Sequence, residues 1–205
     1  MLLDPAVTPA PEMYRFMIGA IVPRPIAFVS TRAADGGANL APFSYFNAIS
    51  SVPPLVGISV VDRPDDPKDT LRNVRETGEL VVNLVSEPML AAMARTAGEW
   101  PRGTSEFEIA GLTPVPSERV APPGVLESTI RFECRLHREI PLGNSFLLVA
   151  EIVLAHARDD VFTDGRVDPV KLAPVGRLGG ELYSLLREVV KEPRPRVSRS
   201  TGSPL

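Results

Sequence analysis

The sequence has little of the chemistry by which many protein classes are recognised. Its single cysteine, Cys134, cannot form a disulfide within the chain, which fits a reducing cytoplasm. Together with only two histidines, His137 and His156, it is too little for a Cys/His zinc site. No apolar run approaches the ~18 residues that a membrane-spanning helix needs, so no membrane is expected as a partner. Residues 1–12 lack the basic start of a signal peptide.

Positive charge is not in excess either. The 22 Lys and Arg against 25 Asp and Glu give a net charge of −3 at pH 7, which excludes a nucleic-acid binder that works by phosphate neutralisation. The Gly-x-Ser-x-Gly motif and any Ser/His/Asp arrangement are missing. Residues 177–180 (RLGG) have no strand-then-helix context, which disfavours a Rossmann fold. The acidic loop around residues 62–69 is of the kind that is usually solvated, so no metal is expected.

Proline is abundant, with 22 in 205 residues, or about 11% against a usual ~5%. Such a chain is cut into short segments, which disfavours long helices. Strands are expected at 26–31, 39–50, 55–61, 79–85, 130–136 and 146–155, with short helices at 12–18, after Lys68 and after Pro88. In the strand at 130–136, apolar Cys134 and its even-numbered neighbours alternate with polar residues, so Cys134 is expected to be a buried, inert thiol.

The dominance of strands favours a mainly β fold, a closed or partly closed antiparallel barrel with short peripheral helices. Residues 12–187 are expected to form one domain. Residues 1–11 are expected to be an extended lead-in, and residues 188–205, which are poor in apolar side chains, a mobile tail.

Small polar and aromatic side chains gather at the end of one expected strand and on the next. Ser30 and Thr31 end one strand, and Ser44, Tyr45 and Asn47 follow in the next. Rings that pack on a flat ligand, with hydroxyl and amide groups at its edge, suit an aromatic heterocycle. The alternative is a pair of ordinary strand ends rich in Ser and Asn.

A helix start carries the second candidate feature. Lys68, Asp69 and Thr70 open a short helix, with Asp69 or Thr70 as the expected N-cap and Arg63 close in sequence. Free N–H groups and the helix dipole favour an anion there. The alternative is a capped helix with a solvated lysine. If both features serve one ligand, that ligand has a planar heterocycle and a phosphate, and FMN fits this description.

The same segments carry a family resemblance. Residues 23–31 (PRPIAFVST), 37–47 (GANLAPFSYFN), 53–54 (PP) and 68–73 (KDTLRN) closely resemble the flavin reductase-like, FMN-binding split-barrel family, in order and spacing over about residues 12–187. The resemblance implies a six-stranded Greek-key split barrel that works as a homodimer, with FMN at the subunit interface. NAD(P)H is the expected electron donor of a flavin reductase of this type.

The resemblance also implies roles for individual residues. Arg24, Ser30 and Thr31 would lie near the isoalloxazine or ribityl part of FMN. Ser44, Tyr45, Phe46 and Asn47 would line the same ligand, and Tyr183 would face the flavin. Ser59, Arg63, Lys68 and Thr70 would lie beside the ribityl chain and the phosphate.

One segment departs from the family pattern. NADH-dependent members often carry Gly-Asp-His, with the histidine near the nicotinamide, where this chain has Gly143-Asn144-Ser145. Two hypotheses therefore stand: an FMN-dependent oxidoreductase that transfers hydride from NAD(P)H to flavin, and an FMN-binding module that stores or senses flavin without turnover. Because a flavin carries its own reactive atoms, no catalytic side chain is expected. Haem binding is disfavoured because neither histidine lies in a ligand setting.

Overall fold

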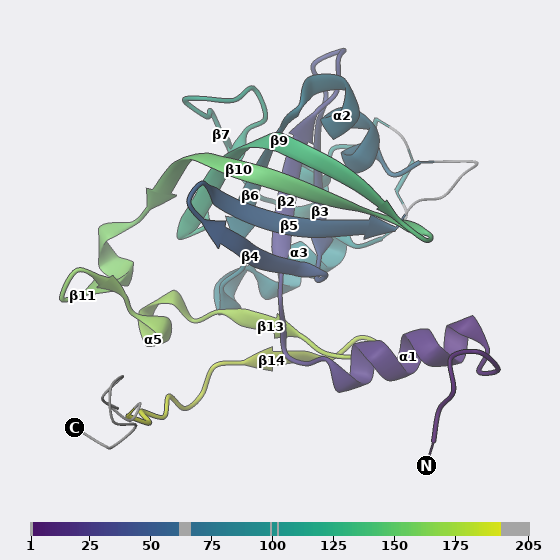
Figure 1. The fold of residues 1–205 in the computed structure, drawn as a ribbon. Coiled ribbons are helices and arrows are strands. Elements are labelled where there is room, and N and C mark those ends of the chain that lie inside the picture. The colour runs from purple at the N-terminus through teal and green to yellow at the C-terminus, as the bar shows by residue number, and fades with distance from the viewer. Residues whose placement is uncertain (1, 62–66, 99, 102, 194–205) are drawn as a thin grey trace, which may run out of the picture.

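A curved antiparallel sheet of seven strands forms the main body of the protein (Figure 1). The structure is a computed structural model and describes residues 2–61, 67–98, 100–101 and 103–193. The strand order is β3-β2-β6-β9-β10-β5-β4. The strands are β2 (Ala27–Arg32), β3 (Ala38–Phe43), β4 (Phe46–Ser51), β5 (Pro54–Val61), β6 (Glu79–Leu84), β9 (Ile130–Leu142) and β10 (Ser145–Ala157).

The connection between the two outer strands makes this sheet a barrel. β3 lies at one edge and β4 at the other, yet only Ser44 and Tyr45 separate them in sequence. Since consecutive Cα atoms are 3.80 Å apart, Phe43 and Phe46 can be at most about 11 Å apart, so the sheet must curl until its edges meet. The predicted mainly β barrel is confirmed, with seven strands where six were expected. The single strand expected over residues 39–50 is wrong at Ser44 and Tyr45, where the chain crosses from one edge to the other.

Two apolar cores lie on the two sides of β2. Ala27 and Val29 face the inside of the barrel, and Ile26 and Phe28 face outward, as the period of a strand requires. The inner core also takes up Leu71 and Val74 of α2 (Asp69–Thr77). The outer core lies against α3 (Leu90–Thr96) and α4 (Glu106–Ala110). Because both faces of β2 are buried, the chain is apolar from Ile26 to Val29, and the buried Ser30 and Thr31 that follow make hydrogen bonds.

A smaller layer lies beside the barrel. It holds α1 (Ala10–Ala20) and a three-stranded sheet of β1 (Arg24–Pro25), β13 (Val175–Arg177) and β14 (Tyr183–Leu185) (Figure 1). α1 is longer than the expected helix and begins within the expected lead-in. It buries none of its residues. The remaining elements are β7 (Pro114–Val115), β8 (Gly124–Val125), β11 (Phe162–Thr163), β12 (Arg166–Val167), α5 (Pro169–Leu172) and two 3₁₀ turns, Glu87–Met89 and Asp159–Val161.

The tail expected from residue 188 is only partly described. Residues 188–193 are exposed and form neither helix nor strand, and the rest lies outside the described residues. No helix in the described part of the chain is long and apolar enough to cross a membrane.

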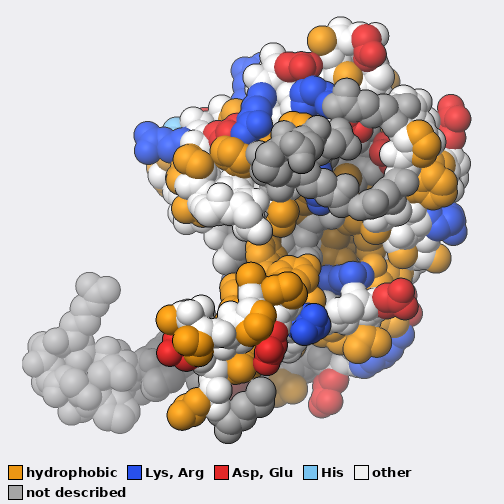
Figure 2. Space-filling view, turned by 90° about the vertical axis from the view of Figure 1, so that its right-hand side faces the viewer, with side chains coloured by type: hydrophobic (Ala, Val, Ile, Leu, Met, Phe, Trp, Pro, Cys, Tyr) orange, Lys and Arg blue, Asp and Glu red, His pale blue; other side chains and the backbone are white. Residues whose placement is uncertain are grey.

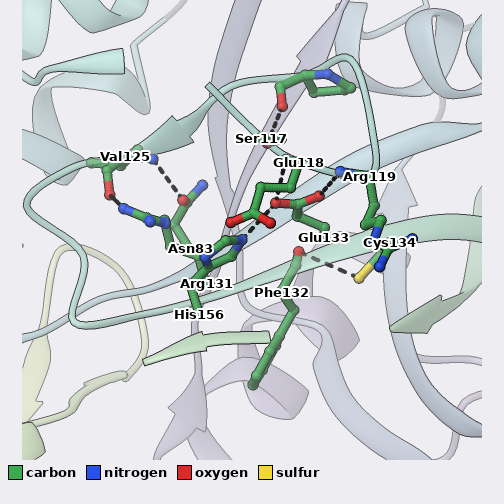
Figure 3. A network of polar contacts seen from close by, with 11 residues as sticks. Asn83, Ser117, Glu118, Arg119, Val125, Arg131, Phe132, Glu133, Cys134 and His156 are labelled. Atoms are coloured by element: carbon green, nitrogen blue, oxygen red, sulfur yellow. Dashed lines mark hydrogen bonds and ion pairs between the residues drawn. The ribbon is translucent and has the colours of Figure 1, made fainter. Parts of the chain in front are cut away.

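A buried carboxylate fastens the segment between β7 and β8 to the barrel (Figure 3). Glu133 lies on the outer face of β9 with only 1% of its surface exposed. It accepts hydrogen bonds from the backbone N–H groups of Glu118 at 2.9 Å and Arg119 at 2.6 Å, and from Nε2 of His156 at 2.6 Å. Burial alone would raise the pKa of Glu133, but these hydrogen bonds stabilise the charged form and hold its pKa below the ordinary value.

The neighbouring thiol points the other way, into the inner core. Cys134 is fully buried, and burial, with the nearby charge of Glu133, raises its pKa to about 12. The native protein is therefore expected to react with Ellman's reagent at pH 8 only on the timescale of unfolding, and at once in guanidinium chloride. Rapid stoichiometric reaction of the native protein would contradict this placement.

Candidate functional site

A cleft of about 750 Å³ separates the barrel from the layer that holds α1, a size typical of small-molecule sites. Figure 2 views this side and shows the hollow between the two parts. The barrel side of the lining is Ile26, Pro42, Phe43, Ser44, Tyr45, Ser59, Val61, Lys68, Met93 and Ala97. The other side is Tyr14, Arg15, Ile18, Arg24, Arg177, Leu178, Gly179, Gly180 and Tyr183.

The link that closes the barrel forms part of the cleft wall. The backbone carbonyl of Tyr45 accepts from the N–H of Ser59 at 2.8 Å, which holds the link against β5. Burial raises the pKa of Tyr45, and Tyr14 raises it further, against a smaller lowering by Arg24. The Tyr45 hydroxyl therefore stays protonated at neutral pH and can donate a hydrogen bond.

Lys68 brings a positive charge to the barrel wall. It is the N-cap residue of α2, in place of the expected Asp69 or Thr70, and its own side chain makes no capping hydrogen bond. Its Nζ lies 5.4 Å from the ring centroid of Phe43, within reach of a cation–π contact. The lysine thus lies beside a helix N-terminus, where anions are favoured.

Arg24 holds the cleft together with its own hydrogen bonds. Its side chain is buried, and Nη1 donates to the carbonyls of Ile18 at 2.7 Å and Ile21 at 2.6 Å. Nη2 donates to the carbonyl of Leu178 at 2.9 Å, and Nε to Oγ of Ser44 at 3.4 Å. Three chain segments therefore meet at one guanidinium, which is mainly occupied in shaping the cleft.

The structure brings five of the eleven sequence-predicted site residues to this cleft. They are Arg24, Ser44, Tyr45, Ser59 and Lys68. Tyr183, which the family resemblance also indicated, lines it too.

Ser30 and Phe46 do not line the cleft, because the barrel uses their side chains. Oγ of Ser30 donates to the carbonyl of Pro123 at 2.5 Å, and Phe46 packs against the inner core. Asn47 is exposed on β4, and Arg63 lies outside the described residues.

Thr31 and Thr70 are also buried away from the cleft. Oγ1 of Thr31 accepts from Nδ2 of Asn73, and Oγ1 of Thr70 accepts from Nδ2 of Asn39, both at 3.0 Å. The two asparagines line a second hollow of about 480 Å³. The hydroxyls of both threonines thus tie α2 to β2 and β3.

Sequence reasoning missed the contribution of α1 to the cleft. Tyr14, Arg15 and Ile18 share one helix face at spacings of three and four residues. The spacing of these three residues can be read in the sequence. Their position in the cleft cannot, because it depends on contacts with the distant segment around Leu178. Arg177, whose guanidinium stacks 4.5 Å from the ring centroid of Tyr183, is likewise brought in by the small sheet.

The described lining of the cleft is positively charged although the chain is acidic overall. Arg15, Arg24, Lys68 and Arg177 line it, and none of its described lining residues is Asp or Glu. Four cations beside three tyrosines favour an anionic ligand with a flat aromatic part. The size and the lining of the cleft are those of a barrel protein that binds a small molecule.

Comparison with known proteins identifies the family. The chain belongs to the flavin reductase like domain family, whose model matches residues 18–171. An uncharacterized protein of Halalkalibacterium halodurans is 43% identical over 207 residues, which cover 98% of this chain and 99% of that protein. Family membership supports a flavin-related oxidoreductase.

Two similar crystal structures carry functional names. Nitrilotriacetate monooxygenase component B from Bacillus cereus is 38% identical, with a TM-score of 0.90 over 94% of this chain and 98% of that one. The 2-nitrobenzoate 2-nitroreductase of Pseudomonas fluorescens is 30% identical, with a TM-score of 0.87 over 98% of this chain and 100% of that one. Both agree with the observed fold over nearly the whole length.

Proposed function

We propose that this protein is an FMN-binding oxidoreductase of the flavin reductase type, which transfers hydride from NAD(P)H to flavin. The observation that carries the proposal is the cleft, where Lys68 lies at the start of α2 and Tyr45 lies in the link between β3 and β4. FMN needs a cation for its phosphate and aromatic or backbone surface for its ring, and both are present. The names of the two similar structures, a monooxygenase component and a nitroreductase, agree with a redox role.

The lining residues divide between the two ends of such a ligand. Lys68 and Ser59 would hold the phosphate and ribityl end, and Ser44 and Tyr45 would meet the ring edge with backbone groups and a protonated hydroxyl. When bound, FMN supplies a ring that accepts a hydride. The protein contributes by orienting the two reactants and by excluding water from the cleft. None of the described lining residues is a cysteine or a histidine, and the proposal gives no lining side chain a covalent role.

A homodimer with the flavin site at its interface is part of the same proposal. α1 and the residues after it expose apolar side chains, with exposed fractions of 53% for Phe16, 59% for Ile21 and 41% for Val22. Grouped apolar exposure of this kind is typical of protein interfaces. Because α1 also lines the cleft, a partner seated on it would lie beside the ligand. A cytoplasmic location fits the single buried thiol.

An FMN-binding module without turnover is the second candidate. Neither histidine lines the cleft, and the tip of the β9–β10 hairpin carries Asn144 and Ser145 where related reductases often have a histidine. Ser145 pairs with Val61, which lines the cleft, so this position lies near the site.

Turnover assays separate the two candidates. The purified protein is mixed with NADH or NADPH and with FMN, FAD or riboflavin, and the loss of absorbance at 340 nm is followed. Steady oxidation is expected, fastest with FMN. Saturable FMN binding without oxidation of either nucleotide would replace the enzyme by the binding module, and failure to bind FMN would overturn both.

A further inference from the structure

Two arginines on the α1 side of the cleft have no acidic partner among the residues that the structure describes. Arg15 is exposed on α1, and Arg177 ends β13 with its guanidinium stacked on Tyr183. Neither forms an ion pair with any carboxylate of the described residues. Lys68 lies on the barrel wall beside Phe43, so the cations of the cleft are divided between its two sides.

The fold holds these two arginines on one wall. Arg24 bonds both the carbonyl of Ile18, one turn after Arg15, and the carbonyl of Leu178, the residue after Arg177. The backbones also touch there, since a Cβ placed on Gly179 would lie 3.6 Å from Cα of Gly19. The end of α1 and the end of β13 are therefore fixed against each other.

Gathering positive charges on one wall costs free energy, and no carboxylate among the described lining residues offsets it. Arg15, Arg177 and the buried Arg24 repel one another, and the repulsion is stronger beside a partly apolar wall than in water. Stacking on Tyr183 fixes the plane of the Arg177 guanidinium. Planar guanidinium groups bind carboxylate and phosphate oxygens through paired N–H donors. An anion between the two arginines would remove the repulsion.

We propose that Arg15 and Arg177 form an anion subsite for the second ligand of the cleft, the one that meets the flavin from the α1 side. The subsite takes a carboxylate or a phosphate group, from an organic acid or from a nicotinamide nucleotide. This inference rests on the proposed function, because it assigns the barrel wall, with Lys68, to FMN. It also assigns a role in ligand selection to α1, a helix that buries none of its residues.

Calorimetric titration of the FMN-loaded protein tests the subsite without relying on turnover. Benzoate probes for a carboxylate, and inorganic pyrophosphate probes for a phosphate. The variants are Arg15→Gln, Arg177→Gln and the double variant. Arg166→Gln, which removes the same charge from exposed β12 outside the cleft, is the control. FMN binding to each variant is measured first.

We expect at least one probe to bind, and each cleft substitution to weaken it roughly tenfold to a hundredfold, the range for loss of a charge-assisted hydrogen bond. Arg166→Gln should bind FMN and the probe within twofold of the parent protein, and each cleft variant is titrated with the probe at an FMN concentration that saturates that variant. The tighter probe identifies the source of the anion. Probe binding that is absent, or equal in all variants, overturns the subsite while FMN binding stands. Failure of the parent protein to bind FMN instead overturns the proposed function.

Discussion

Replacing Lys68 by alanine is expected to weaken FMN binding by about 1–3 kcal/mol and to leave riboflavin binding nearly unchanged. The two ligands share the ring and the ribityl chain and differ in the phosphate. Lys68 lies at the start of α2 on the barrel wall of the cleft, so its ammonium group and the helix start both favour an anion there. If Lys68 binds the phosphate as proposed, its loss removes a charge-assisted hydrogen bond that FMN can make and riboflavin cannot.

Fluorescence titration with both flavins measures the difference. Lys191→Ala is the matched control, because Lys191 is exposed in the C-terminal segment and does not line the cleft. An FMN dissociation constant equal to that of the parent protein would refute the phosphate assignment. Equal weakening of FMN and riboflavin would place Lys68 against the ring instead.

Replacing Glu133 by alanine is expected to lower the free energy of unfolding by about 3 kcal/mol. The substitution strands two backbone N–H groups and the ring of His156, all of which now donate to one buried carboxylate. Glu133→Gln keeps the shape of the side chain and one acceptor oxygen, so it should lower the free energy of unfolding by less than Glu133→Ala does. Urea unfolding at pH 7 measures both, with Glu188→Gln, on an exposed side chain, as the control.

The same contacts predict a pH dependence. The folded-state pKa of Glu133 lies below its ordinary value, so its charge stabilises the fold at neutral pH, and this contribution is lost as the pH falls through the folded-state pKa. The stability gap between the parent protein and Glu133→Gln should therefore narrow below about pH 4.5. A difference in the free energy of unfolding that stays constant down to pH 3, or widens, would contradict the claim that Glu133 is charged in the folded protein.

Much of the fold could be predicted because local chemistry and tertiary structure agree. The alternation of residues 130–136 gives β9 its two faces, and Gly78 ends α2 in the left-handed conformation that glycine adopts freely. Glu133 shows where this reasoning stops. The alternation places Glu133 on the polar face of β9 and so predicts that its side chain is exposed to solvent. In the structure the segment between β7 and β8 covers this side chain, and no local sequence pattern indicates that contact.

The site could be predicted in part for the same reason. Lys68 could be predicted because a helix start is a local feature. Ser44 and Tyr45 were found by their polar and aromatic side chains, although the break between β3 and β4 at these residues was not expected. Thr31 and Thr70 have the right chemistry for a ligand, yet asparagines on neighbouring elements take up their hydroxyls. The α1 wall depends on Arg24 reaching the carbonyl of Leu178, 154 residues away in sequence, which no spacing rule predicts.

The most direct test of the account is a titration of the purified protein with FMN and with riboflavin, followed by quenching of flavin fluorescence. The cleft predicts saturable FMN binding at micromolar concentration or below. Riboflavin should bind more weakly because it has no phosphate for the cationic barrel wall to bind. A protein that binds neither flavin at these concentrations would show that the cleft between the barrel and α1 serves another ligand.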